Sequence, residues 1–169
     1  GGADLTFPHH ECEIAQTESL TGKPMARYWM HNAFLNLGNE KMSKSVGNVI
    51  TVREFVSRVK PEAIRLLMLS THYRNPLNFT DEAIEQANNA LARFVNCRDN
   101  LSHLLQNVSA ETARFSEMDP AVKERLDGIH DMFHAKMSDD FNTADAITAM
   151  FELVRSEEHT SELQSLRHL

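Results

Sequence analysis

The chain of 169 residues has only two cysteines, Cys12 and Cys97, and no run that approaches the ~20 apolar residues needed to cross a bilayer. Two cysteines do not make a disulfide framework, which favours a reducing, cytoplasmic setting. The N-terminus has neither an initiator methionine nor a basic stretch followed by an apolar one. We therefore expect no secretory signal, no membrane partner, and a start inside a longer protein.

The net charge of −7 conceals an uneven distribution of charge along the chain. Residues 41–74 contain seven Lys/Arg and two acids, a net of +5, whereas residues 75–154 contain six bases and fourteen acids, a net of −8. An anionic ligand is therefore expected to prefer the middle of the chain. Ordinary scatter of surface charge is the alternative interpretation.

Residues 1–50 read as the end of an α/β domain. A helix is predicted over residues 8–20, because a proline opens this stretch and a glycine follows it. Residues 26–37 are rich in aromatic and apolar side chains and are predicted to be extended. Gly38 and Asn39 predict a turn that leads into a lysine-rich loop.

Residues 51–79 read as a connecting helical region. The stretch from Thr51 to Glu54 has the form of a capping box, so a helix is expected to begin at Val52. Pro61 is expected to open a second helix. The apolar side of that helix is predicted to consist of Ile64, Leu67 and Met68.

Residues 80–154 are predicted to be helical throughout and to form an antiparallel bundle. Apolar residues recur at spacings near three and four, which predicts one buried stripe. Further helices are expected from Pro120 and from Thr143, which can cap the last one. The predicted stripe consists of Ile84, Ala87, Leu91, Phe94, Leu101 and Leu105.

Residues 155–169 have an unusual sequence for the end of a protein. The apolar helical pattern stops at Val154, and residues 155–165 resemble the conceptual translation of a widely used short-read sequencing adapter. A natural polar helix end is the alternative. We exclude this tail from inferences about fold and function.

Residues 41–45, Lys-Met-Ser-Lys-Ser, place two lysines and two hydroxyls within five residues. Two lysines three apart on a loop can contact a polyphosphate from two sides, because an ammonium is a compact charge that suits phosphate oxygens. The order of these residues resembles the signature loop of class I aminoacyl-tRNA synthetases. A solvated turn is the alternative.

Residues 7–13, Phe-Pro-His-His-Glu-Cys-Glu, combine imidazoles, carboxylates and a thiol. On a helix His9 and Glu13 share a face and can present a nitrogen and an oxygen to one zinc ion, although two ligands make an incomplete site. A surface His–Glu pair is the alternative. Cys12 is three residues from His9 and is equally consistent with a small packing residue.

Five segments together resemble the cysteinyl-tRNA synthetase family, and they span residues 1–154. The expected fold class is therefore α/β plus all-α: the C-terminal part of a Rossmann-like class I synthetase catalytic domain, followed by an antiparallel helical bundle on the tRNA-binding side. The matching segments are 1–16, 28–32, 40–48, 72–79 and 139–143.

The resemblance implies a set of site residues. His9 and Glu13 match the family's zinc-binding histidine and glutamate, whose two cysteine partners are expected upstream of residue 1, as is the H-I-G-H motif. Lys44, and then Lys41, are expected to be catalytic and to contact ATP. Further residues are expected to shape the ATP loop (Met42 and Ser43) or the substrate pocket (Trp29 and His31).

The resemblance also implies an activity and its partners. L-cysteine, ATP with Mg²⁺ and tRNA(Cys) would be the substrates, zinc would bind the cysteine thiolate, and cysteinyl adenylate would be the intermediate. We expect a monomer. Since both the H-I-G-H motif and the zinc cysteines are missing from the 169 residues, the isolated chain is expected to be inactive.

Two alternatives to this function are kept. One is the related ligase that joins cysteine to an amino-sugar inositol in mycothiol synthesis, and the other is a non-catalytic, tRNA-binding fragment. Residues 72–74 are expected to stabilise the region between the two domains, although Arg74 could instead face tRNA. Residues 139–143 are expected to form a helix-start turn without a catalytic role.

Overall fold

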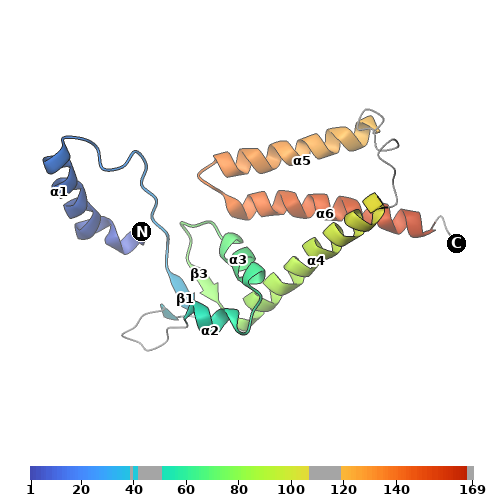
Figure 1. The fold of residues 1–169 in the computed structure, drawn as a ribbon, viewed down its shortest axis with the longest axis horizontal. Helices are drawn as coiled ribbons and strands as arrows, with labels where there is room; N and C mark the ends of the chain where they lie inside the picture. The colour runs from blue at the N-terminus through green and yellow to red at the C-terminus, as the bar shows by residue number, and fades with distance from the viewer. Residues whose placement is uncertain (39, 42–50, 107–118, 167–169) are drawn as a thin grey trace.

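The computed structural model describes residues 1–38, 40–41, 51–106 and 119–166. Its elements form an N-terminal helical arm, a small sheet with two short helices beside it, and a group of three long helices (Figure 1). None of the helices in the described ranges is both long and apolar enough to span a membrane.

The arm begins with a 3-10 turn at Ala3–Leu5 and a wider turn at Thr6–His10, and continues as α1 (Glu11–Thr21). Gly22 ends α1 with φ of 64°, a left-handed conformation that suits glycine. The predicted helix over 8–20 is therefore confirmed, with its first residues in a wider turn.

The sheet has the strand order β2-β1-β3, built from Glu40–Lys41, Leu35–Leu37 and Leu77–Phe79. Strand β1 runs parallel to β3 and antiparallel to β2. Of the region predicted to be extended over 26–37, only the last three residues pair as a strand. A single parallel bridge between Gly2 and Asn32 continues the pairing towards the arm.

Two short helices, α2 (Val52–Val56) and α3 (Pro61–Leu69), connect β2 and β3 in the sequence. The predicted capping box is present, because the Thr51 hydroxyl accepts from the Glu54 amide and the Glu54 carboxylate accepts from the Thr51 amide. The predicted apolar side of α3 is only partly right. Ala63 and Leu67 are buried, whereas Met68 is 43% exposed.

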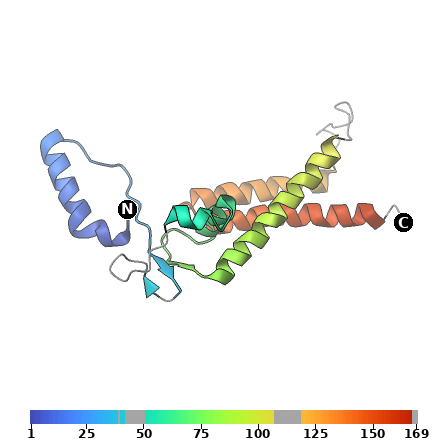
Figure 2. The ribbon, with the colours of Figure 1, turned by 60° about the horizontal axis from the view of Figure 1, so that its bottom comes forward.

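The long helices are α4 (Asp81–Gln106), α5 (Pro120–Ser138) and α6 (Thr143–Leu166). Helices α5 and α6 run antiparallel, and α4 crosses α6 obliquely (Figures 1 and 2). The predicted cap at Thr143 is wrong, because Asn142 Oδ1 accepts from the Asp145 amide and thus caps α6. Helix α6 continues into the segment from 155 to 166, whose adapter origin stays a prediction.

Small side chains form the interior of the helical part. Ala63 of α3 and Ala149 of α6 have no exposed surface, and Ala146 has 1%. Small residues let helices approach closely, which matches the packing of α3 and α4 against α6. The predicted stripe on α4 holds near Ala87 but fails at its far end, where Leu105 is 68% exposed.

We predict that Ala149→Leu destabilises the fold by about 1–3 kcal/mol, because the buried site has no space for three more carbon atoms. Ala92→Leu, at an exposed position of α4, is the matched control and leaves stability nearly unchanged. Urea unfolding followed by circular dichroism measures both. Equal midpoints for the two variants would contradict this account of the core.

Candidate functional site

The first residues of the chain pair with the extended segment that precedes β1. The Gly1 ammonium donates to the Met30 carbonyl at 3.1 Å. The Asn32 amide donates to the Gly1 carbonyl at 2.8 Å, and the Ala3 amide donates to the Asn32 carbonyl at 2.9 Å. These bonds hold the start of the helical arm against residues 30–32.

This pairing brings three aromatic rings together. His10 Nδ1 lies 2.7 Å from His31 Nε2, so one ring carries the shared hydrogen and the other accepts it. Trp29 stacks on His31 with ring centroids 6.0 Å apart, and its centroid is 5.3 Å from that of His10. The cluster therefore fixes the two imidazole rings relative to each other and to the indole of Trp29.

Two members of this cluster, Trp29 and His31, were predicted as pocket residues from the sequence. His10 was missed, although it follows His9 directly in the predicted metal motif. The signal that could have found it is the i, i+2 spacing of Trp29 and His31, which puts both rings on one side of an extended segment that needs a partner.

His9 and Glu13 are both exposed and lie four residues apart where the backbone becomes helical. An imidazole nitrogen and a carboxylate oxygen are zinc ligands, and i, i+4 spacing suits one ion. No group of three or more His, Cys, Asp or Glu side chains is assembled for a metal within the described ranges. The donor types of His9 and Glu13 are compatible with zinc, and their role as ligands stays a prediction.

The lysine loop lies mostly outside the described residues. The backbone of Lys41 is in β2 and pairs with Asn36 of β1. Gly38, with φ of 60°, makes the turn before it. Met42, Ser43 and Lys44 are not among the residues that the structure describes.

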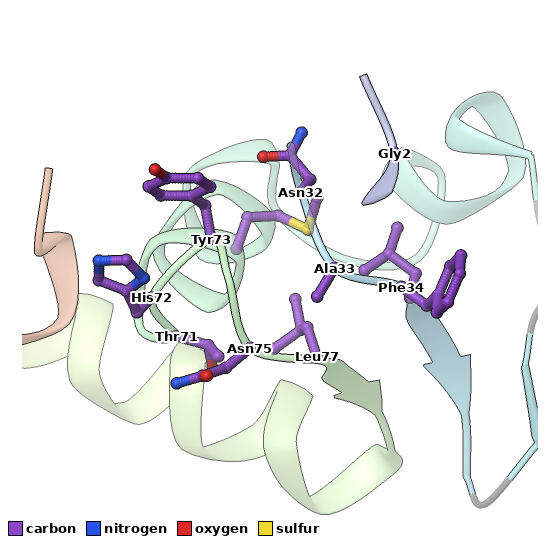
Figure 3. Close-up of a pocket in the computed structure, with 11 residues that line it drawn as sticks. Gly2, Asn32, Ala33, Phe34, Thr71, His72, Tyr73, Asn75 and Leu77 are labelled. Carbon is purple, nitrogen blue, oxygen red and sulfur yellow. The ribbon is translucent and has the colours of Figure 1, made fainter. Parts of the chain in front are cut away.

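A cleft of about 480 Å³ separates the segment around Asn32 from the end of α3 and the residues that follow it. Figure 3 shows Gly2 and Phe34 at one end of this cleft and His72 at the other. Tyr73 also lines it, and its carbonyl accepts from the Ala33 amide at 2.8 Å. Among the predicted site residues that the structure describes, none lines this cleft.

The Asp140 carboxylate, in the turn between α5 and α6, joins the helices to residues 72–74. It accepts from the Tyr73 hydroxyl at 2.6 Å and from Arg74 Nε at 2.5 Å and Nη2 at 3.2 Å. Hydrogen bonds from Arg74 and then Tyr73 lower the pKa of Asp140 from 3.8 to about 2. The same bond raises the pKa of Tyr73. These contacts are consistent with the expected stabilising role of residues 72–74, which stays a prediction.

Exposed cations gather on α2, α3 and the turn between them. Four Lys/Arg side chains in this region are exposed, and Glu54 and Glu62 are the acids on these helices. Such a concentration of exposed cations favours an anionic ligand. The four cations are Arg53, Arg58, Lys60 and Arg65.

With this geometry in place, comparisons identify the family. Residues 1–89 match the family model described as tRNA synthetases class I (C) catalytic domain, and residues 132–162 match the DALR domain. The chain therefore belongs to the class I (C) tRNA synthetase family.

Individual relatives are cysteine–tRNA ligases. The one from Caldicellulosiruptor saccharolyticus is 52% identical over 155 residues, with 92% of this chain and 32% of the relative covered. The one from Bacillus cytotoxicus is 47% identical, with 96% and 36% covered. The chain thus spans about a third of the length of these relatives.

A solved structure shares the fold. It is the ternary complex of a LeuRS from Agrobacterium radiobacter K84 with tRNA and LeuAMS, at a TM-score of 0.76 and 19% identity. The match covers 95% of this chain and 22% of that one. The chain therefore has a class I synthetase-like fold, mostly helical with a small mixed sheet.

We predict that the stability added by Asp140 depends on pH. Because its folded pKa is about 2 against an ordinary 3.8, its contribution is full above 3.8 and is lost as the pH falls through about 2. The stability gap between the wild-type chain and Asp140→Asn should therefore close as the pH is lowered over this window. Urea unfolding at several pH values measures the gap.

The control for this titration is Asp139→Asn, which removes the neighbouring carboxylate and leaves the contacts of Asp140 in place. A gap between wild type and Asp140→Asn that stays constant from neutral pH to about pH 2 would contradict the assignment.

Proposed function

We propose that this chain supplies one side of the active site of a cysteine–tRNA ligase, which joins L-cysteine to tRNA(Cys) with ATP through cysteinyl adenylate. One observation carries the proposal. Residues 1–89 match the catalytic domain, and within them residues 1–3 pair with residues 30–32. This pairing puts His10, the neighbour of His9 in the sequence, in contact with His31. The relatives' name, cysteine–tRNA ligase, favours an RNA substrate over an amino-sugar acceptor.

The amino acid end of the site is assigned to the helical arm. His9 and Glu13 would hold half of a zinc shell, and a bound zinc would accept the cysteine thiolate, which serine's hydroxyl replaces poorly. Trp29 and His31 would form the wall beside it, and the bond from His10 would fix the orientation of the His31 ring. A rigid wall of this kind positions the substrate carboxylate for attack on the α-phosphate of ATP.

The ATP end is assigned to the loop that leaves β2. Lys41 begins at the sheet, where its backbone is fixed by pairing with Asn36. Lys44 would contact the β- and γ-phosphates, with Lys41 second, and Met42 and Ser43 would shape the loop. The role is electrostatic, because pyrophosphate leaves with negative charge that an ammonium and Mg²⁺ stabilise.

The tRNA is assigned to the helical side. The exposed cations of α2 and α3 would contact phosphates, and α4, α5 and α6 would form an antiparallel bundle that supports the RNA. We expect the enzyme to be monomeric, because the amino acid, ATP and RNA contacts proposed here all come from one polypeptide.

The role of Lys44 can be tested in a chimera. Residues 1–154 replace the matched segment of the Caldicellulosiruptor saccharolyticus ligase, which they resemble at 52% identity. Lys44→Ala should lower cysteine-dependent pyrophosphate exchange about 10²-fold or more, because a charge that stabilises the transition state is lost. Lys23→Ala removes an exposed lysine after α1 and is the matched control.

Equal exchange rates for the Lys44→Ala and Lys23→Ala chimeras would remove the lysine loop from the mechanism. A chimera that is folded by circular dichroism and gives no exchange with cysteine would contradict the proposed function itself.

The metal assignment has a readout that is separate from activity. The purified chimera should retain a stoichiometric zinc ion after dialysis, and both His9→Ala and Glu13→Gln should lose it, because three remaining donors bind zinc less tightly than four. Elemental analysis measures the metal content. His130→Ala, an exposed imidazole on α5, is the control, and loss of zinc from it alone would place the metal elsewhere.

A further inference from the structure

The turn between α5 and α6 contacts a segment that lies 66 to 68 residues earlier in the chain. Two neighbouring residues of that segment, Tyr73 and Arg74, donate to Asp140. His72 Nε2 lies 3.8 Å from the same carboxylate. Three consecutive side chains therefore converge on one acidic group.

The contact is more constrained than an ordinary surface ion pair. The carboxylate is 41% exposed and Arg74 is 59% exposed, so a simple pair here would contribute little. However, Arg74 donates through two nitrogens to both oxygens, which fixes the mutual orientation. Its guanidinium also lies over the Tyr73 ring, 5.1 Å from the centroid, and Tyr73 stacks on His72.

The backbone of the turn directs the carboxylate. Asp140 and Phe141 have φ of 51° and 53°, a left-handed conformation that is uncommon outside glycine and that aspartate tolerates better than most residues. The turn is closed by hydrogen bonds from the Asn142 amide to the Lys136 carbonyl and from the Thr143 amide to the Phe141 carbonyl. Such a conformation persists only where the surroundings hold it.

The other end of the contact leads to the candidate site. The Tyr73 carbonyl accepts from the Ala33 amide, and the Leu77 amide donates to the Phe34 carbonyl. Residue 33 lies two positions after His31. Thus the segment that contacts Asp140 is hydrogen-bonded to residues 33 and 34, which directly follow the extended segment that carries Trp29 and His31.

We propose that Asp140 is a positioning residue, which holds the α5–α6 hairpin in one orientation against residues 72–74 so that RNA bound to the helices meets the aminoacyl site. The inference rests on the proposed function and deepens it, since it assigns Asp140 to the transfer step and not to the activation of cysteine. Removing the Asp140 contacts should therefore slow the transfer of cysteine to tRNA and leave the activation of cysteine with ATP nearly unchanged.

The test uses the chimera and two assays. Asp140→Asn preserves the size of the side chain and its tolerance of positive φ, and removes the charge. We expect pyrophosphate exchange within about 2-fold of the parent chimera, and kcat/KM for tRNA(Cys) lowered about 10-fold, the scale of losing a hydrogen bond to a charged group. Tyr73→Phe, which removes one donor, should give a smaller loss of the same kind.

Two controls separate the carboxylate from the turn and from nearby charge. Asp140→Gly relieves the left-handed backbone but has no side chain, so it should behave like Asp140→Asn. Asp139→Asn should behave like the parent chimera. Equal losses in both half-reactions, no loss in either, or full transfer activity in Asp140→Gly would overturn the proposal.

Hydrogen exchange on the isolated 169-residue chain distinguishes this proposal from the proposed function. Asp140→Asn should accelerate amide exchange in both the 139–143 turn and residues 72–75, because each segment restrains the other. Faster exchange in the turn alone would refute the proposed restraint between Asp140 and residues 72–74, whether or not the chimera is active. A chimera without cysteine-dependent exchange would refute the proposed function and leave this result to be judged separately.

Discussion

The backbone hydrogen bonds of residues 32–34 hold the candidate site together. Asn32 pairs with Gly1 and Ala3, Ala33 donates to Tyr73, and Phe34 accepts from Leu77. Through these bonds one extended segment carries the helical arm on one side and the connection to the long helices on the other. The positions of His9 and Glu13, of the aromatic cluster, and of Asp140's partners all follow from it.

Such a strand-centred arrangement suits a reaction with three substrates. The arm presents the aromatic cluster and the two proposed metal ligands, β2 carries the backbone of Lys41, and α2 and α3 carry exposed cations. Chemistry and RNA binding are therefore assigned to different elements that share one segment. Charge-assisted hydrogen bonds from Tyr73 and Arg74 to Asp140 join the turn between α5 and α6 to residues 72–74.

The sequence predicted features that depend on neighbours within a few residues. The capping box at Thr51, the prolines that open α3 and α5, and the glycine that ends α1 were all confirmed. Contacts between residues far apart in the sequence were harder to predict. Large apolar residues such as Leu105 suggested a long stripe, but alanines form most of the buried interior. The partner of Arg74 lies 66 residues away, and no local pattern near Asp140 indicates it.

In the candidate site, too, local features were predicted and a long-range contact was missed. Trp29 and His31 were predicted and lie together, His10 was missed because its partner is 21 residues distant, and the roles of His9, Glu13 and the lysines stay predictions. The most direct measurement is pyrophosphate exchange by the chimera with cysteine compared with serine. The account predicts rapid exchange with cysteine and little with serine. Equal exchange with both amino acids, or none with cysteine, would contradict it.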